Sequence, residues 1–264
     1  MIIDFHAHTF PDRIAAKALS SLSSKSGVTP VTNGTLSDTL EKMRGWGVDK
    51  FVSLNIATNP RQEENVNNFA ISIQSDSVIP FGSVHPESEH ALAQLEKLKS
   101  AGIKGVKFHP EYQEFAIEEA RMEKIYQTCS DLGLIVLFHA GYDIGYPDSA
   151  RCLPENAAKI ARKFPDLTIV LAHLGGWRNW DEVETHLMGI DNVYLDTSFL
   201  KGYLEPEQCA RIIRRHGADH ILLGSDCPWQ TTQDAISYLE GLGLSREEKE
   251  LIFSQNAVRI LSLS

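Results

Sequence analysis

Five side chains able to ligate a metal ion close or directly follow apolar segments of this 264-residue chain. His6 and His8 are two residues apart, so on an extended strand both imidazoles point to the same side. His139 and His173 each close an apolar run, and Asp226 follows another. Imidazole and carboxylate groups bind divalent ions such as Zn²⁺, and a catalytic ion keeps one position open for water or substrate. The residue types therefore favour metal-assisted chemistry, provided that the fold brings them together.

The chemistry that such a site would perform is the activation of water. A divalent ion lowers the pKa of a bound water towards neutrality and so supplies a nucleophile. Asp226 suits two roles there, as a weak ligand and as the general base that takes the proton. His173 is either a further ligand or the group that polarises a substrate carbonyl or holds the leaving group.

The elements that must position these residues form a repeating pattern. Short runs rich in Val, Ile, Leu and Phe recur roughly every 30 residues, the length of a strand–helix unit. Continuous apolar runs of this length are typical of parallel strands covered on both faces. The predicted strands are residues 2–6, 50–54, 78–84, 103–108, 134–139, 167–173, 193–196 and 221–224. The predicted helices are residues 63–75, 88–100, 118–132, 154–164, 206–216, 232–242 and 247–261.

Eight such units predict an α/β fold of the (β/α)₈ TIM-barrel type, in which the carboxyl ends of the strands meet at one mouth. A doubly wound sheet is the competing fold, but it would place a glycine-rich turn after the first strand, where this chain has His6-Ala7-His8. No linker or change in composition divides the chain, so we expect a single domain over residues 1–264. The polar segment 20–34 is predicted to be a loop that covers the mouth.

Composition narrows the class of protein further. The formal net charge of −10 disfavours a general nucleic-acid binder, because phosphate backbones attract basic surfaces. No apolar run approaches the roughly 20 residues of a membrane span, and the first residues lack the features of a signal peptide. The four cysteines are scattered, which suits reduced thiols. We therefore expect a cytoplasmic protein that binds neither nucleic acid nor membrane.

Four segments at the strand ends form a specific set of motifs: His6-Ala7-His8, His139, Ala172-His173-Leu174-Gly175-Gly176 and Gly224-Ser225-Asp226-Cys227-Pro228-Trp229. Taken together, these motifs resemble those of the amidohydrolase superfamily, and most of all its amidohydrolase-related (amidohydrolase 2) branch of metal-dependent hydrolases and decarboxylases. The resemblance implies a distorted barrel with a metal at its mouth. It makes His6, His8, His139 and Asp226 the metal ligands, and it gives His173 a catalytic role near the substrate.

The fourth predicted strand leaves several alternatives open. Lys107 and His109 lie on one face of it by strand alternation. In binuclear members of the superfamily, a lysine at the end of this strand is carboxylated and bridges two metals. Lys107 would then be that bridge, with His139 and His173 serving the second ion. Otherwise Lys107 binds a substrate carboxylate or forms an internal ion pair, and His109 and Glu111 either line the pocket or organise the turn.

The leading hypothesis is a hydrolase in which metal-activated water attacks an ester, lactone or amide of a small molecule. The alternative is a metal-dependent, non-oxidative decarboxylase of an aromatic or unsaturated carboxylic acid, since the same ligands serve both reactions. A TatD-type nuclease and a barrel without catalysis are weaker hypotheses. Zn²⁺ is the expected metal, with Mn²⁺, Fe²⁺ and Co²⁺ also compatible with these ligands. We expect a small-molecule substrate, a carboxylate being one candidate with Arg178 as its anchor. The sequence leaves the oligomeric state open, and a homo-oligomer is only the common default.

Overall fold

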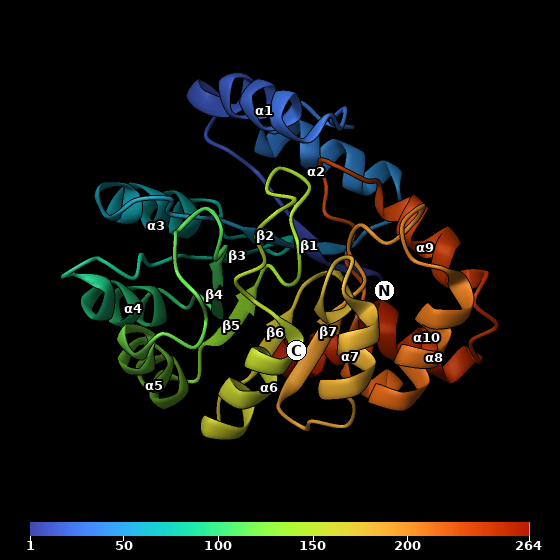
Figure 1. Cartoon of the computed structure of the whole chain (residues 1–264). Helices are drawn as coiled ribbons and strands as arrows, with labels where there is room; N and C mark the ends of the chain where they lie inside the picture. Colours follow the sequence, from blue (N-terminus) through green and yellow to red (C-terminus); the bar gives the residue numbers. More distant parts are fainter. Residues whose placement is uncertain (264) are drawn as a thin grey trace.

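Eight short parallel strands follow one another around a central axis, and helices cover them on the outside (Figure 1). The computed structural model describes residues 1–263. The predicted single domain over residues 1–264 stays a prediction, and its last residue lies outside the described range. All eight predicted strands are present, although most are shorter than predicted. The strands are β1 Ile3–Ala7, β2 Lys50–Leu54, β3 Val78–Phe81, β4 Gly105–Phe108, β5 Ile135–Phe138, β6 Ile169–Leu171, β7 Val193–Asp196 and β8 Ile221–Leu222.

The strands stand in chain order but in two hydrogen-bonded sheets, β1-β2-β3 and β4-β5-β6-β7-β8. Single parallel bridges join these sheets, one between Gly82 and Val106 and the other between Ala7 and Cys227. A Cβ atom on Gly82 would lie 2.5 Å from the Leu98 side chain, so the close approach at the first seam requires glycine. The predicted eight-unit barrel is thus confirmed, and it is distorted because single bridges hold two of its seams.

The inside of the barrel is a packed apolar core. Strand residues fill it, including Phe5, Val52, Phe81 and Leu137, and Leu261 from the last helix closes the end nearest both termini. Because the interior is filled in this way, a substrate of this barrel is expected beyond the carboxyl ends of the strands rather than inside it. Within residues 1–263, no helix is both long and apolar enough to cross a membrane.

Most of the predicted helices are present, with ends that differ by a few residues. These are α3 Glu63–Ser72, α4 Ala91–Ser100, α5 Glu123–Leu132, α6 Pro154–Lys163, α8 Pro206–His216 and α9 Thr232–Glu240. The last predicted helix is interrupted: α10 Arg246–Glu250 and α11 Asn256–Leu261 flank a π-helical turn at Leu251–Gln255. The backbone carbonyl of Ile252 in that turn accepts a hydrogen bond from the backbone N–H of Leu223, which attaches the turn to the end of β8.

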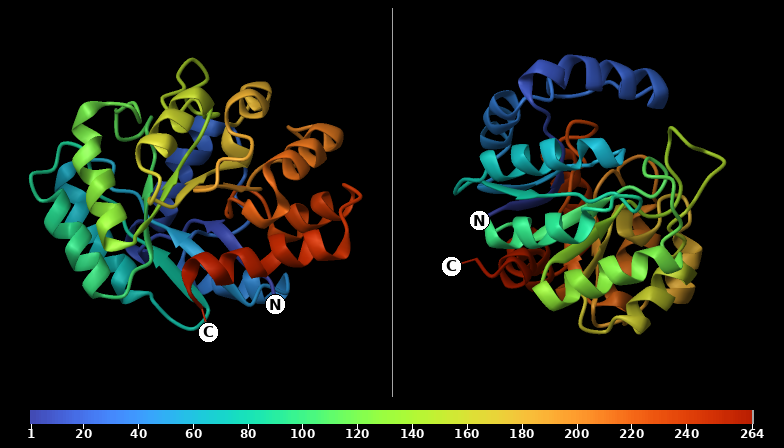
Figure 2. Two further views of the ribbon diagram at one scale, coloured as in Figure 1. Left: turned by 90° about the horizontal axis from the view of Figure 1, so that it is seen from below. Right: turned by 90° about the vertical axis from the view of Figure 1, so that its left-hand side faces the viewer.

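Three helices were not predicted, and one of them corrects the prediction of a loop over residues 20–34. The first helix, α1, runs over Asp12–Ser26, so the loop begins only at Gly27. It forms because Ala15 and Leu19, one turn apart, are buried, and Leu19 packs beside Phe10 and Gly34. Figure 2 shows α1 set apart from the ring of outer helices, at the top of the right-hand view. The other two are α2 Leu36–Gly45 and α7 Trp180–His186.

Candidate active site

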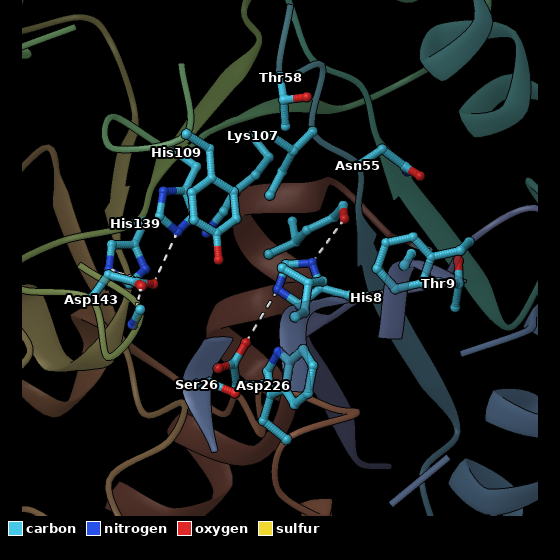
Figure 3. Close-up of a pocket in the computed structure, with 18 of the residues that line it drawn as sticks. His8, Thr9, Ser26, Asn55, Thr58, Lys107, His109, His139, Asp143 and Asp226 are labelled. Atoms are coloured by element: carbon cyan, nitrogen blue, oxygen red, sulfur yellow. Dashed lines mark hydrogen bonds and ion pairs between the residues drawn. The ribbon is translucent and has the colours of Figure 1, made fainter. Parts of the chain in front are cut away.

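A cavity of about 540 Å³ opens at the carboxyl ends of the strands. Figure 3 shows polar side chains from several strands pointing into it. The structure brings seven of the sequence-predicted site residues to its wall, although the first and the last of them are 220 positions apart in the chain: His6, His8, Lys107, His109, His139, His173 and Asp226. Two groups of potential ligand atoms lie within it, one formed by His6, His8 and Asp226 and one formed by His109, His139 and Asp143.

The nearest atoms of His6, His8 and Asp226 are all hydrogen-bond acceptors. His6 Nδ1 lies 2.8 Å from Asp196 Oδ2, and His8 Nδ1 lies 3.0 Å from the carbonyl oxygen of Leu54. Both partners can only accept a hydrogen bond, so each Nδ1 carries the proton and each Nε2 keeps a lone pair. Both Nε2 atoms lie 3.2 Å from Asp226 Oδ1. With neutral rings, three lone-pair atoms face one another, and a cation among them, or a proton on one of the rings, would stabilise this arrangement.

The charges around this cluster favour such a cation. Burial raises the pKa of Asp226, but His6 and His8 more than offset this and hold it well below its usual range, so the carboxylate is ionised. Burial lowers the pKa of His6, but Asp196 and Asp226 outweigh it and the net pKa is raised. The same two carboxylates that favour a proton on His6 favour a metal ion at this point.

His139 and His173 form a second pair of acceptors beside the first cluster. His173 Nδ1 lies 3.0 Å from the carbonyl oxygen of Ser198, and His139 Nε2 lies 3.1 Å from that of Tyr142. Each of these nitrogens therefore donates, which leaves His173 Nε2 and His139 Nδ1, 3.0 Å apart, as facing lone pairs. Burial lowers both pKa values to about 3, so both rings are neutral near neutral pH. The His173 ring lies 5.4 Å from that of His6.

On its other side, His139 contacts a second cluster, formed with His109 and Asp143, and Asp143 was not among the residues predicted from the sequence. Asp143 Oδ2 lies 3.3 Å from His109 Nε2 and 3.7 Å from His139 Nε2. His109 is stacked between Tyr112 and His139, with ring centroids 3.6 and 4.2 Å away. Asp143 follows His139 by four residues in the loop after β5, and that local spacing was a usable signal. Glu111 lies behind His109, buried, and is not part of the cavity wall.

Lys107 is buried in the cavity wall without an ionic partner. Its side chain is 1% exposed, and within residues 1–263 no carboxylate oxygen lies within 4.0 Å of its amine. Burial lowers the pKa of the amine to about 8, although Asp196, Asp226 and Asp143 oppose that shift. The amine is therefore available to bind an anionic group that enters the cavity. Arg178, the other candidate anchor, is exposed, and its guanidinium lies over the Trp177 ring outside the cavity wall.

Asp196 and Ser198, which sequence reasoning did not single out, hold two of the histidines in place. Asp196 Oδ2 accepts from His6, while Oδ1 accepts from the backbone N–H groups of His173 and Ser198, 3.1 and 3.0 Å away. The Ser198 hydroxyl also donates to Oδ1 and lies 3.0 Å from His173 Nδ1. Burial opposes charge on Asp196, but His6 holds its pKa well below the usual range. Asp196 closes β7, as His139 follows β5, so the same signal was present in the sequence.

Strained backbone also marks this part of the chain. Residues other than glycine adopt positive φ angles at or next to the cavity wall, among them His173 at 57°, Leu174 at 55°, Phe199 at 57° and Asp226 at 66°. Such conformations cost about 1–3 kcal/mol each and persist where surrounding contacts impose them. At Asp226 one such contact is the hydrogen bond from its backbone N–H to the carbonyl of His6, 2.8 Å long. Strain at two of the predicted site residues fits a site held for function.

Comparisons with known proteins support the family resemblance and the barrel fold. The family model described as "Amidohydrolase" (Amidohydro_2) matches residues 3–263. No curated protein matches the sequence. Among solved structures, an uncharacterised TIM-barrel protein from Bordetella bronchiseptica is similar, with 22% identity and a TM-score of 0.81 over 99% of this chain and 98% of the other.

Two further solved structures represent different reactions on the same fold. A dihydroxybenzoic acid decarboxylase from Polaromonas sp. JS666, with bound manganese and the inhibitor 2-nitroresorcinol, is 18% identical with a TM-score of 0.72, over 99% of this chain and 97% of the other. A probable 2-pyrone-4,6-dicarboxylic acid hydrolase from Acinetobacter baumannii is 16% identical with a TM-score of 0.68, over 99% of both chains. At these identities the similarity establishes the barrel fold.

Proposed function

Because this chain belongs to the amidohydrolase family, we propose that it is a metal-dependent hydrolase of an ester, lactone or amide bond in a small molecule. One observation carries the proposal. The lone pairs of His6 and His8 and an ionised oxygen of Asp226 converge at 3.2 Å, beside an open cavity. A donor set of this kind fits a divalent ion, and its position at the mouth gives a substrate access to that ion.

In this proposal His6, His8, His139 and Asp226 hold a single ion. Zn²⁺ is the first candidate because neutral imidazoles and a carboxylate suit it, and Mn²⁺, present in the Polaromonas decarboxylase, is the second. When bound, the ion polarises a substrate oxygen and makes water more acidic. The lone pair of His139 Nδ1 lies 3.0 Å from Nε2 of His173, whose ring is next to that of His6, and this position supports His139 as the fourth ligand.

The protein's own groups supply the remaining chemistry. Asp226 is ionised and borders the cavity, so it accepts the proton of the attacking water. His173 is held through Nδ1 at Ser198, which leaves Nε2 to orient the substrate carbonyl or the leaving group. Lys107 provides an amine for a carboxylate of the substrate or product. In the alternative role, Lys107 is carboxylated and bridges two ions. That role predicts two ions per chain instead of one, so metal content distinguishes the two roles.

Non-oxidative decarboxylation is the second candidate, and a specific observation favours it. Lys107 lies unpaired in a cavity whose outer walls are largely apolar, among them Leu54, Phe69, Trp177 and Trp229. A carboxylate bound there would lose much of its hydration, which favours loss of carbon dioxide. The relative from Polaromonas carries out a decarboxylation according to its name.

Metal content and reaction products test these proposals together. We expect about one ion per chain after loading with Zn²⁺, retained in a His90→Gln control at an exposed histidine and lost in His8→Gln. Two ions per chain would indicate the bridged site instead, and no binding of Zn²⁺ or Mn²⁺ would refute the mechanism. With loaded protein, ¹⁸O from labelled water in an acid product identifies hydrolysis, and carbon dioxide from an aromatic acid identifies decarboxylation. Asp226→Asn abolishes the first reaction if Asp226 is the base.

A further inference from the structure

We propose that the substrate carries an apolar substituent that lies against α1, and that Ile14, Ala18 and Leu22 determine this preference. The inference rests on the proposed function, because it places the reacting end of the substrate at the metal ligands. It goes further in naming the chemical class of the remaining part of the substrate and the helix that recognises it.

The first observation is the pattern of apolar residues on α1. Ile14, Ala18 and Leu22 follow one another at intervals of four, so they form a stripe along one face of the helix. All three line the same cavity as the metal-ligand candidates. The buried residues of α1 are Ala15 and Leu19, which occupy the neighbouring face. The stripe is therefore not used in packing α1 against the rest of the protein, and Ile14 remains 42% exposed.

The second observation is that α1 is fixed over the cavity at both ends. Before its start, Phe10 pairs with Thr35, and its backbone N–H donates to the carbonyl of Gly34 over 2.8 Å. Near its end, the ammonium of Lys25 lies 3.4 Å from the centre of the Tyr146 ring in the loop after β5. Residues from both halves of the helix, from Arg13 to Ser26, line the cavity. The stripe is thus held at a defined place opposite the strand ends.

The third observation is the size and lining of the space between them. A cavity of about 150 Å³ is large enough to bind benzene, whereas this cavity measures about 540 Å³. A single-ring acid at the metal ligands therefore leaves much of it unfilled. The rest of the cavity wall includes the apolar side chains of Ile56, Val66 and Phe69, next to the polar side chains of Thr58, Gln62 and Asn65. Water in contact with the apolar parts of this wall and with the stripe is displaced favourably by an apolar group.

Charge at the edges of the stripe gives the competing interpretation, an acidic substituent. Arg13 and Lys25 also line the cavity, one at each end of the stripe. Lys25 is already placed over an aromatic ring, and Arg13 is exposed to solvent. Between them α1 contributes the three residues of the stripe, one hydroxyl from Ser21 and no further charge, so we assign the substituent as apolar and let the experiment include the acidic alternative.

Calorimetric titration of the Zn²⁺-loaded full chain with a series of acids tests the assignment. Benzoate, 4-methylbenzoate, 4-ethylbenzoate and 4-butylbenzoate are suitable probes, because a carboxylic acid is the product of the proposed hydrolysis and the substrate of the alternative decarboxylation. Each methylene that becomes buried should tighten binding by up to about fourfold. We expect Leu22→Ser to remove at least about fourfold of the gain from benzoate to 4-butylbenzoate, and Ala16→Ser, at an exposed position of α1 outside the cavity wall, to leave the gain unchanged.

A second variant works in the opposite direction and guards against simple misfolding. Ala18→Leu fills the space beside the stripe, so it should weaken binding of 4-butylbenzoate and leave that of benzoate as in the wild type. A flat series in the wild type, an equal gain in Leu22→Ser, or tighter binding of 4-(3-carboxypropyl)benzoate than of 4-butylbenzoate would overturn the inference. Failure of the proposed function is recognised separately, since benzoate would then bind equally well with and without Zn²⁺.

Discussion

Replacing Asp196 by asparagine should weaken metal binding without touching a ligand. The carboxylate accepts four hydrogen bonds, one from His6 Nδ1 at Oδ2 and three at Oδ1 from the backbone of His173 and from the backbone and hydroxyl of Ser198. An asparagine has a single acceptor oxygen, and the three donors on the Oδ1 side will hold it there. Its amide NH₂ then faces His6 Nδ1.

This change in hydrogen bonding alters which of the two nitrogens of the His6 ring carries the proton. An NH₂ group facing His6 Nδ1 requires a lone pair at that nitrogen, so the proton moves to Nε2, which is the atom that faces Asp226 at 3.2 Å. A protonated Nε2 cannot bind a metal. Loss of a partner that orients a ligating histidine typically costs 10- to 100-fold in metal affinity, or about 1.4–2.8 kcal/mol. We expect Asp196→Asn to fall in this range.

Competition between the metal-free protein and a chromophoric chelator for Zn²⁺ measures this change directly. Asp219→Asn is a matched control, because it makes the same substitution at another His–Asp contact, exposed and away from the cavity. Ser198→Ala removes one donor to Asp196 but keeps the acceptor for His6, so its Zn²⁺ affinity should change by only a few fold. A folded Asp196→Asn protein that binds Zn²⁺ as tightly as the wild type would refute this account of the His6 tautomer.

Three further predictions concern stability. Burial lowers the pKa of Lys107 from its ordinary 10.5 to about 8, so the folded state disfavours the ammonium. Lys107→Met should therefore raise the free energy of unfolding at pH 7 by up to about 3 kcal/mol in urea titrations, with a gain that shrinks as the pH rises from 8 to 10.5. Burial raises the pKa of Glu111 from 4.5 to about 7, so between these pH values only the unfolded chain releases this proton. Wild-type stability should contain a component that falls with rising pH across that window, by up to about 3 kcal/mol, and Glu111→Gln should lack it. Gly141 has a φ of 80°, and an added Cβ would lie 2.3 Å from the backbone nitrogen of Trp177. Gly141→Ala should therefore cost at least twice as much as Gly189→Ala, which has a similar φ but open space around it and should cost about 1–2 kcal/mol; equal costs would contradict this.

The barrel was predictable because its strands are apolar on both faces. A run such as residues 134–138 has no polar alternation, and a strand of that kind fits only where helices and a packed interior cover it. His139 then stands at the mouth simply because the strand has ended. The helix α1 was not predictable in the same way. Its second half, from Ser20 to Ser26, is rich in serine and buries none of its side chains. What fixes it is the contact of Leu19 with Gly34 and of Lys25 with Tyr146, both formed by the folded chain.

Within the site, the residue types could be predicted but not the direction of each ring. Nothing in the sequence near His6 indicates that its Nδ1 meets a carboxylate 190 residues away. Asp196 closes an apolar strand as clearly as the predicted ligands do, yet its role appears only when the partner across the barrel is known. Ser198 is hidden for the same reason. The loop of His139 also turns its Nε2 towards the carbonyl of Tyr142, which decides that Nδ1 is the nitrogen left free.

Different parts of the cavity wall hold the metal ligands and recognise the substituent of the substrate. At the strand ends, the outer nitrogens of four histidines are committed to acceptors: Asp196 for His6, Leu54 for His8, Tyr142 for His139 and Ser198 for His173. The inner nitrogens are consequently free for a cation, whichever reaction follows. The stripe on α1 lies on the other side of the cavity and has no polar contact with this network. A change in the stripe should therefore alter the preference for substituents at constant metal affinity, and a change at Asp196 should do the reverse. Measuring both quantities for Leu22→Ser and Asp196→Asn tests that separation, because coupled effects in either variant would mean that α1 and the ligand network move as one unit.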